Sequence, residues 1–126
     1  MNQLRDLLDR IGRLNPRLNA FLTVTADLAI AQAKAAEERA RRGARRGPLD
    51  GVPYSLKDLE PTAGIRTTFG SKWFEQHVPT EDGVVAERLK ATGAVLLGKL
   101  NQDEFAMGSS CEGSAFGPTR NPWNTG

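Results

Sequence analysis

The chain has 126 residues, of which 39% are hydrophobic and 25% charged, a composition typical of one globular domain that excludes wholesale disorder. Its formal net charge of +2 is too small to predict nucleic-acid binding, and its single cysteine, Cys111, excludes an intrachain disulfide and fits a reducing compartment. No apolar run approaches the ~20 residues of a membrane span. We therefore expect a cytoplasmic protein without membrane contact.

The first 46 residues predict two helices with a short strand between them. Apolar residues at helical spacing indicate an amphipathic helix that ends near Pro16. Residues 18–24 alternate in polarity and predict a strand. Thr25 is placed to cap a second helix that reaches about Arg42. The arginine cluster of residues 39–46 is either a solvated helix end, which we favour, or an RNA-facing patch.

The remaining residues predict α/β layering. Residues 51–57 form a short apolar run behind a Gly/Pro turn, as in a buried strand. Residues 60–80 are rich in turn formers, and their aromatic side chains require a packing partner. Asp82 can cap a helix that stops at Gly93, and the all-apolar residues 94–98 predict a strand buried on both faces.

Lys57 is the candidate catalytic residue. It ends the predicted strand of residues 51–57, so its stem is expected in the core and its amine near the sheet edge. Desolvation at such a position lowers the pKa of an ammonium group and makes it a general base. The alternative is a surface lysine whose charge stays in water, and this segment alone favours that alternative.

Three further patterns suggest sites and are disfavoured. Residues 93–100 resemble a phosphate-binding loop, but an apolar strand replaces the glycine-rich cradle and Leu100 stands where Ser or Thr would bind magnesium. Cys111 and His77 could form a thiol–imidazole pair, but both are single residues far apart in sequence. Residues 109–110 are serines outside any Gly-x-Ser-x-Gly elbow, so we expect substrate contacts or ordinary loop residues rather than nucleophiles.

Several strings in a fixed order closely resemble the amidase signature family. Residues 51–58 read Gly-Val-Pro-Tyr-Ser-Leu-Lys-Asp, residues 63–71 read Ala-Gly-Ile-Arg-Thr-Thr-Phe-Gly-Ser, and residues 101–110 read Asn-Gln-Asp-Glu-Phe-Ala-Met-Gly-Ser-Ser. Residues 121–124, Asn-Pro-Trp-Asn, complete the set. Within the family these strings are most similar to the A subunits of glutamyl-tRNA(Gln)/aspartyl-tRNA(Asn) amidotransferases or to a related stand-alone amidase.

The resemblance implies an α/β fold, the N-terminal and incomplete part of a mixed sheet flanked by helices. We expect residues 1–46 to be a helical lead segment and residues 47–126 to begin the signature core. The implied chemistry is hydrolysis of a carboxamide C–N bond by two serines, one of them after a cis peptide bond, with Lys57 as base and no metal or cofactor. The serines belong to a Gly/Ser-rich segment that residues 1–126 do not contain, so we expect this chain alone to be inactive.

The resemblance also implies a substrate loop and partners. Met107, Gly108 and Ser109 match the loop at the entrance to the substrate pocket, whereas Asp103, Glu104 and Arg120 are expected to tie that loop to the core. The expected substrate is a small amide such as glutamine, with further amidotransferase subunits as possible partners and no direct nucleic-acid contact by this chain. The competing hypothesis is a catalytically inactive fragment or interaction module.

Overall fold

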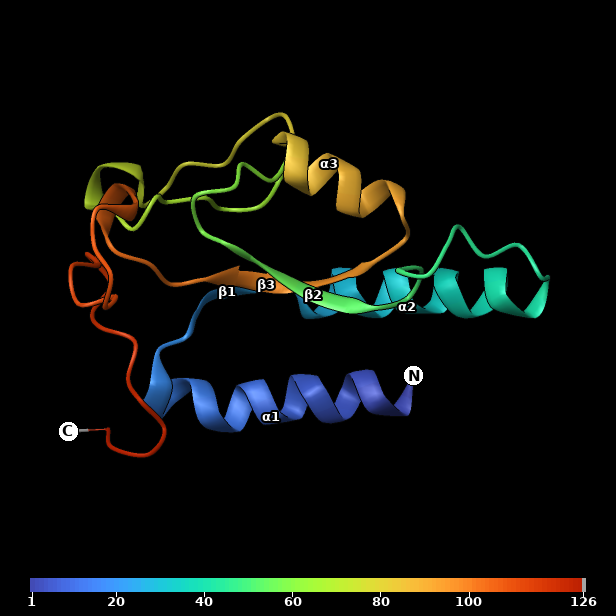
Figure 1. Cartoon of the computed structure of the whole chain (residues 1–126), viewed down its shortest axis with the longest axis horizontal. Coiled ribbons are helices and arrows are strands. Elements are labelled where there is room, and N and C mark those ends of the chain that lie inside the picture. Colours follow the sequence, from blue (N-terminus) through green and yellow to red (C-terminus); the bar gives the residue numbers. More distant parts are fainter. Residues whose placement is uncertain (126) are drawn as a thin grey trace.

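A computed structural model describes residues 1–125 as a mixed sheet between helical layers (Figure 1). The elements are α1 (Asn2–Leu18), β1 (Phe21–Val24), α2 (Ala26–Arg41), β2 (Pro53–Lys57), α3 (Val84–Ala91) and β3 (Val95–Leu100). Two short 3₁₀ turns, η1 (Lys72–Phe74) and η2 (Glu104–Ala106), lie in the loops. The predicted α/β class is therefore confirmed.

The strand order is β1-β3-β2, so β3 is the central strand. It runs parallel to β2, with Leu56 opposite Lys99, and antiparallel to β1. Gly98 lies where β1 approaches most closely, since a Cβ built there would stand 2.2 Å from the backbone oxygen of Thr23. A glycine is therefore required for the β1–β3 pairing.

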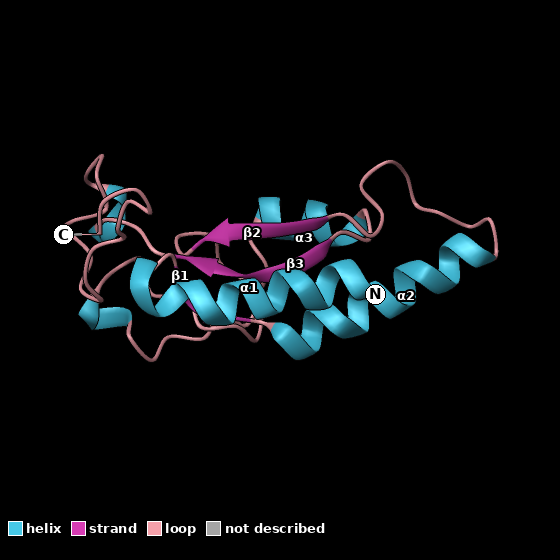
Figure 2. Ribbon diagram, turned by 90° about the horizontal axis from the view of Figure 1, so that it is seen from below, coloured by secondary structure: helices cyan, strands magenta, loops and turns pink. Residues whose placement is uncertain are grey.

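Both faces of β3 are buried, as its apolar sequence predicted. Val95 and Leu97 pack with Leu4 of α1 and Ala29 of α2, whereas Leu96 packs with residues of β2 and α3 on the opposite face. Figure 2 shows α1 and α2 crossing one face of the sheet, with α3 behind the other. This alternation follows from the two-residue period of a strand, which sends neighbouring side chains to opposite faces.

All three predicted helices are present, but the residues expected to end or cap them make other contacts. The first helix continues past Pro16 to Leu18, and the left-handed Asn19 ends it. Thr25 precedes α2, yet its hydroxyl donates to the backbone oxygen of Leu96 rather than capping the helix. Asp82 accepts from the backbone N–H of Ala63 instead of capping α3. These polar side chains fasten helices to the sheet and to the neighbouring loop.

The loop of residues 60–80 is ordered by aromatic packing. Phe74 meets Phe69 edge-on at 5.2 Å between ring centroids, and it also packs against His77 and Phe105. The expectation that every aromatic residue here packs is wrong for Trp73, which is 92% exposed. The hydroxyl of Ser71 accepts the backbone N–H of Trp73 in the turn, and that side chain is left outside the cluster.

Candidate functional site

The candidate site lies where β2 and β3 end. These two strands are parallel, so their carboxyl ends lie at the same edge of the sheet. Figures 1 and 2 show the loops that follow both strands gathered at that edge, beside the C-terminal end of α1. The carboxyl ends of parallel strands are the usual location of ligand sites in open α/β sheets.

Lys57 is the last residue of β2, and its Nζ donates to the backbone oxygen of Asn101 at 2.6 Å. Leu56 is buried toward α3, so the pleat directs the side chain of Lys57 to the opposite face. Lys57 is exposed within the described residues, contrary to the expected burial, because β2 is an edge strand of the three-stranded sheet. The sequence thus predicted the position of this lysine but not its environment.

Asn101 uses all the hydrogen-bonding capacity of its side-chain amide. Nδ2 donates to the backbone oxygens of Asn19 at 3.2 Å and Gly117 at 2.9 Å. Oδ1 accepts from the backbone N–H of Gln102 at 2.9 Å and the hydroxyl of Ser114 at 2.7 Å. Only 2% of Asn101 is exposed. One buried residue therefore joins the end of α1, the end of β3 and the following loop.

A second lysine, Lys99, lies on the α3 side of the sheet and is fully buried. Its Nζ donates to the backbone oxygen of Glu60 at 2.7 Å and to the hydroxyl of Thr67 at 2.9 Å, and lies 3.6 Å from Oδ1 of Asp58. The other oxygen of Asp58 accepts the backbone N–H and hydroxyl of Thr68. Burial lowers the pKa of Lys99, and Asp58 opposes that effect.

The amine of Lys99 therefore holds the loop after β2 to the sheet through hydrogen bonds and the contact with Asp58. It is not available to bind a phosphate. The pairing of Lys99 with Asp58 was not predicted from the sequence. A signal was available, because Lys99 follows directly on an apolar run within one strand, where a charge requires a partner.

Asp103 organises the loop that contains the predicted substrate residues. Its carboxylate accepts the backbone N–H groups of Gly113 at 2.8 Å and Cys111 at 3.0 Å, and these bonds lower the pKa of Asp103. A Cβ at Gly108 would lie 2.4 Å from the same carboxylate. The structural role expected for Asp103 is thus confirmed, and the loop passes so close to it that only glycine fits at position 108.

The other two charged residues of this region differ from one another. Glu104 accepts a hydrogen bond of 2.6 Å from the hydroxyl of Ser71, which ties the loop to residues 63–71 as expected. Arg120 is exposed, and only its backbone N–H is tied, to the oxygen of Leu18. The expected side-chain role of Arg120 is therefore not found among the described residues.

Met107, Gly108 and Ser109 form an exposed stretch of this loop, with Met107 86% exposed. Within residues 1–125, no hydrogen bond joins them directly to Lys57. The connection runs through the loop itself, which begins at Asn101. Their role as substrate contacts therefore stays a prediction.

The alternative nucleophiles have other partners. The hydroxyl of Ser110 donates to Glu112, and the sulfur of Cys111 lies 3.3 Å from the hydroxyl of Thr119. His77 belongs to the aromatic cluster. No hydrogen bond joins Cys111 to His77 in the described part of the chain, so the thiol–imidazole hypothesis has no geometric support.

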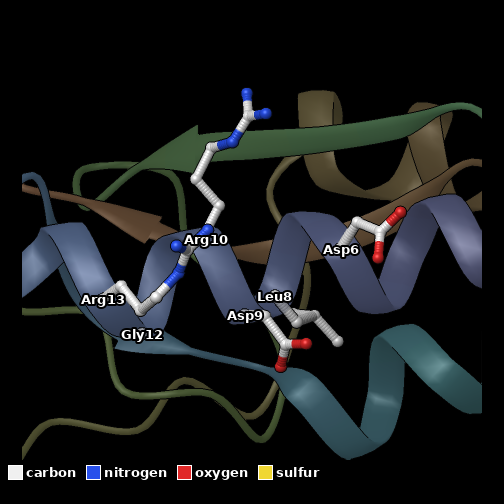
Figure 3. Close-up of a pocket in the computed structure, with 6 residues that line it drawn as sticks. All are labelled: Asp6, Leu8, Asp9, Arg10, Gly12 and Arg13. Atoms are coloured by element: carbon white, nitrogen blue, oxygen red, sulfur yellow. The ribbon is translucent and has the colours of Figure 1, made fainter.

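One surface depression lies away from this edge of the sheet. It has a volume of about 750 Å³ and is lined by residues of α1 alone (Figure 3): Asp6, Leu8, Asp9, Arg10, Gly12 and Arg13. Figure 3 shows Arg10 and Asp9 on opposite sides of the helix, so their charges do not converge. Residues 1–125 contain no cluster of three acidic, His or Cys side chains suited to a metal, and none of their helices could cross a membrane.

The family model described as Amidase matches residues 2–126. The A subunit of the glutamyl-tRNA(Gln) amidotransferase of Geobacter metallireducens is 55% identical over 120 residues, which are 95% of this chain and 24% of that relative. The chain thus spans about a quarter of the length of the curated relatives it matches.

Solved structures agree with the sequence comparison. The peptide amidase from Stenotrophomonas maltophilia has a TM-score of 0.85 at 35% identity, covering 97% of this chain and 26% of that chain. The A subunit of the glutamyl-tRNA(Gln) amidotransferase from Thermotoga maritima has a TM-score of 0.73 at 35% identity, covering 97% and 24%. The chain therefore belongs to the amidase family.

Proposed function

We propose that a protein carrying this chain hydrolyses a carboxamide C–N bond with Lys57 as the general base. The main support for the proposal is the hydrogen bond from Lys57 to the backbone oxygen of Asn101. Its Nζ donates to a neutral carbonyl, and it forms no ion pair within residues 1–125. This carbonyl fixes Nζ at the carboxyl end of β2, next to the loop that carries the predicted substrate residues, where a general base could reach a bound amide.

The proposed reaction has two stages. A serine outside residues 1–126 attacks the amide carbon while its proton passes, through a second serine, to the neutral amine of Lys57. The tetrahedral intermediate collapses, the C–N bond breaks, and the proton returns to the leaving nitrogen, which releases ammonia or an amine and leaves an acyl-enzyme. Water then attacks the ester carbon while its proton passes, through the second serine, to Lys57. The ester C–O bond breaks, the proton returns to the attacking serine, and the carboxylic acid product leaves.

The proposed substrate is a small amide such as glutamine, with Met107, Gly108 and Ser109 near its acyl portion. The relatives named as A subunits of glutamyl-tRNA(Gln) amidotransferases support glutamine, and further subunits would then be partners. The structural similarity to a peptide amidase supports a second substrate class, peptide amides. Direct nucleic-acid contact by this chain is not part of the proposal.

The test measures ammonia release by the full-length protein from glutamine and from a peptide amide. Replacing Lys57 by Ala should lower kcat by at least ~10²-fold, as expected for loss of a general base. Lys72→Ala is the matched control, because Lys72 is an exposed lysine paired with Glu75. A Lys57→Ala variant with the kcat of the control would refute the proposal, and a parent protein without turnover would favour the interaction-module alternative.

A further inference from the structure

The backbone oxygen that accepts from Lys57 belongs to Asn101, a residue that is held in place by many hydrogen bonds. A backbone carbonyl at the end of a strand can normally rotate with its loop. Here the carbonyl belongs to Asn101, whose side chain makes four hydrogen bonds to three different segments and whose backbone N–H donates to Ala20. Buried amides with every donor and acceptor satisfied hold a single local geometry.

We infer that Asn101 is the positioning residue of Lys57: its buried side chain fixes the carbonyl that aims the amine. The inference rests on the proposed function, in which Lys57 is the base, and names a residue that serves it. Asn101 acts through Lys57 and is not itself expected to touch the substrate.

The chemistry of a neutral amine explains the need for such a residue. A neutral lysine has two N–H bonds and one lone pair. Donation of one N–H to the Asn101 oxygen, at 2.6 Å, restricts the directions in which the lone pair can point. The same oxygen faces the positive charge that forms when the amine accepts a proton. Movement of this carbonyl would therefore misdirect the base and remove a stabilising dipole.

If Asn101 only held the loop in place, any other variant that loosens this loop should lower kcat to the same extent. The side-chain amide of Asn19 tethers the same loop, donating to the backbone oxygens of Phe116, Gly117 and Pro118. It leaves the carbonyl of Asn101 untouched. Asn19 is left-handed, so Asn19→Gly deletes the tether without backbone strain. This variant is the matched control for a loosened loop.

The experiment compares Asn101→Ala with Asn19→Gly in the full-length protein, by steady-state kinetics and thermal unfolding. Misplacement of a catalytic group by about 1 Å costs up to ~10²-fold, so Asn101→Ala should lower kcat by about 10- to 100-fold. KM should change by less than about 3-fold, because ground-state binding is kept. Asn19→Gly should keep a nearly normal kcat at a comparable loss of thermal stability.

A double-variant cycle tests whether the effect passes through Lys57. In a Lys57→Ala background, Asn101→Ala should change the residual rate by less than about 2-fold, because residues acting as a unit are non-additive. If Asn101→Ala fails to fold, Ser114→Ala removes one of the four bonds and should show the same dependence on Lys57 with a smaller loss.

The inference is overturned if Asn19→Gly matches Asn101→Ala in kcat, if Asn101→Ala alters KM alone, or if its effect persists without Lys57. A normal kcat for Asn101→Ala beside an inactive Lys57→Ala refutes only this inference. A normal kcat for Lys57→Ala refutes the proposed function itself.

Discussion

Lys99→Met in the full-length protein should be strongly destabilising. The change removes the cation that is paired with a fully buried carboxylate, and it also leaves the backbone oxygen of Glu60 and the hydroxyl of Thr67 without this donor. Breaking one side of a buried ion pair costs about 3–5 kcal/mol. Replacing both partners, in Asp58→Asn with Lys99→Met, should lose less than Lys99→Met alone, because neither charge of the pair then remains.

Urea denaturation and thermal unfolding measure these effects. Lys90→Met is the matched control, because Lys90 is an exposed lysine that pairs with Asp82 at 3.1 Å. An exposed pair contributes only about 0–1 kcal/mol. If Lys99→Met lowered the free energy of unfolding no more than Lys90→Met does, the buried pair would contribute no more to stability than an exposed pair.

Other parts of the structure lead to three more predictions. Arg39 and a backbone N–H hold the pKa of Asp50 far below its ordinary value, so Asp50 stabilises the fold above its unfolded pKa of about 3.9 and this contribution is lost as the pH falls further. Asp50→Asn should therefore flatten the acid limb of a stability–pH curve, and an unchanged limb would contradict this. Gly98→Ala should cost about 1–3 kcal/mol, or separate β1 from β3, because its methyl group overlaps the Thr23 carbonyl; a normal melting temperature would be inconsistent. Residues 1–126 prepared alone should show no amide turnover and should self-associate through the exposed edges of β1 and β2, as sedimentation would detect; a cooperatively melting monomer would instead favour the module hypothesis.

The sequence predicted elements whose signals are local. The apolar run of residues 94–98 is typical of a strand buried on both faces, and the structure places β3 at the centre of the sheet. The ends of elements were harder to predict, because Thr25 and Asp82 bind groups distant in sequence instead of their own helices. The hydrogen-bond partner of such a side chain depends on which segments of the chain lie side by side in the fold. The periodicity of a sequence does not predict this.

In the candidate site, too, the residues with a local sequence signal were predicted, whereas their contacts with distant residues were not. The family strings predicted Lys57 as the base, which stays a prediction. Its contact with Asn101 joins residues 44 apart and forms only when β2 pairs with β3. The apolar run before Lys99 indicated that this charge needs a partner, but it did not indicate Asp58, because the two residues meet only through strand register. The exposure of Lys57 could not be inferred from its apolar neighbours, because those neighbours point to the other face.

The role of Lys57 as the base is tested by the single-turnover acylation rates of full-length Lys57→Arg and Lys57→Ala. Arginine keeps a positive charge but does not lose its proton at working pH, so it cannot act as a base. If Lys57 is the base, both variants should acylate at least ~10²-fold more slowly than the parent protein. A Lys57→Arg variant that acylates at nearly the parent rate would show that this position supplies charge alone, and would contradict the assignment of Lys57 as the base.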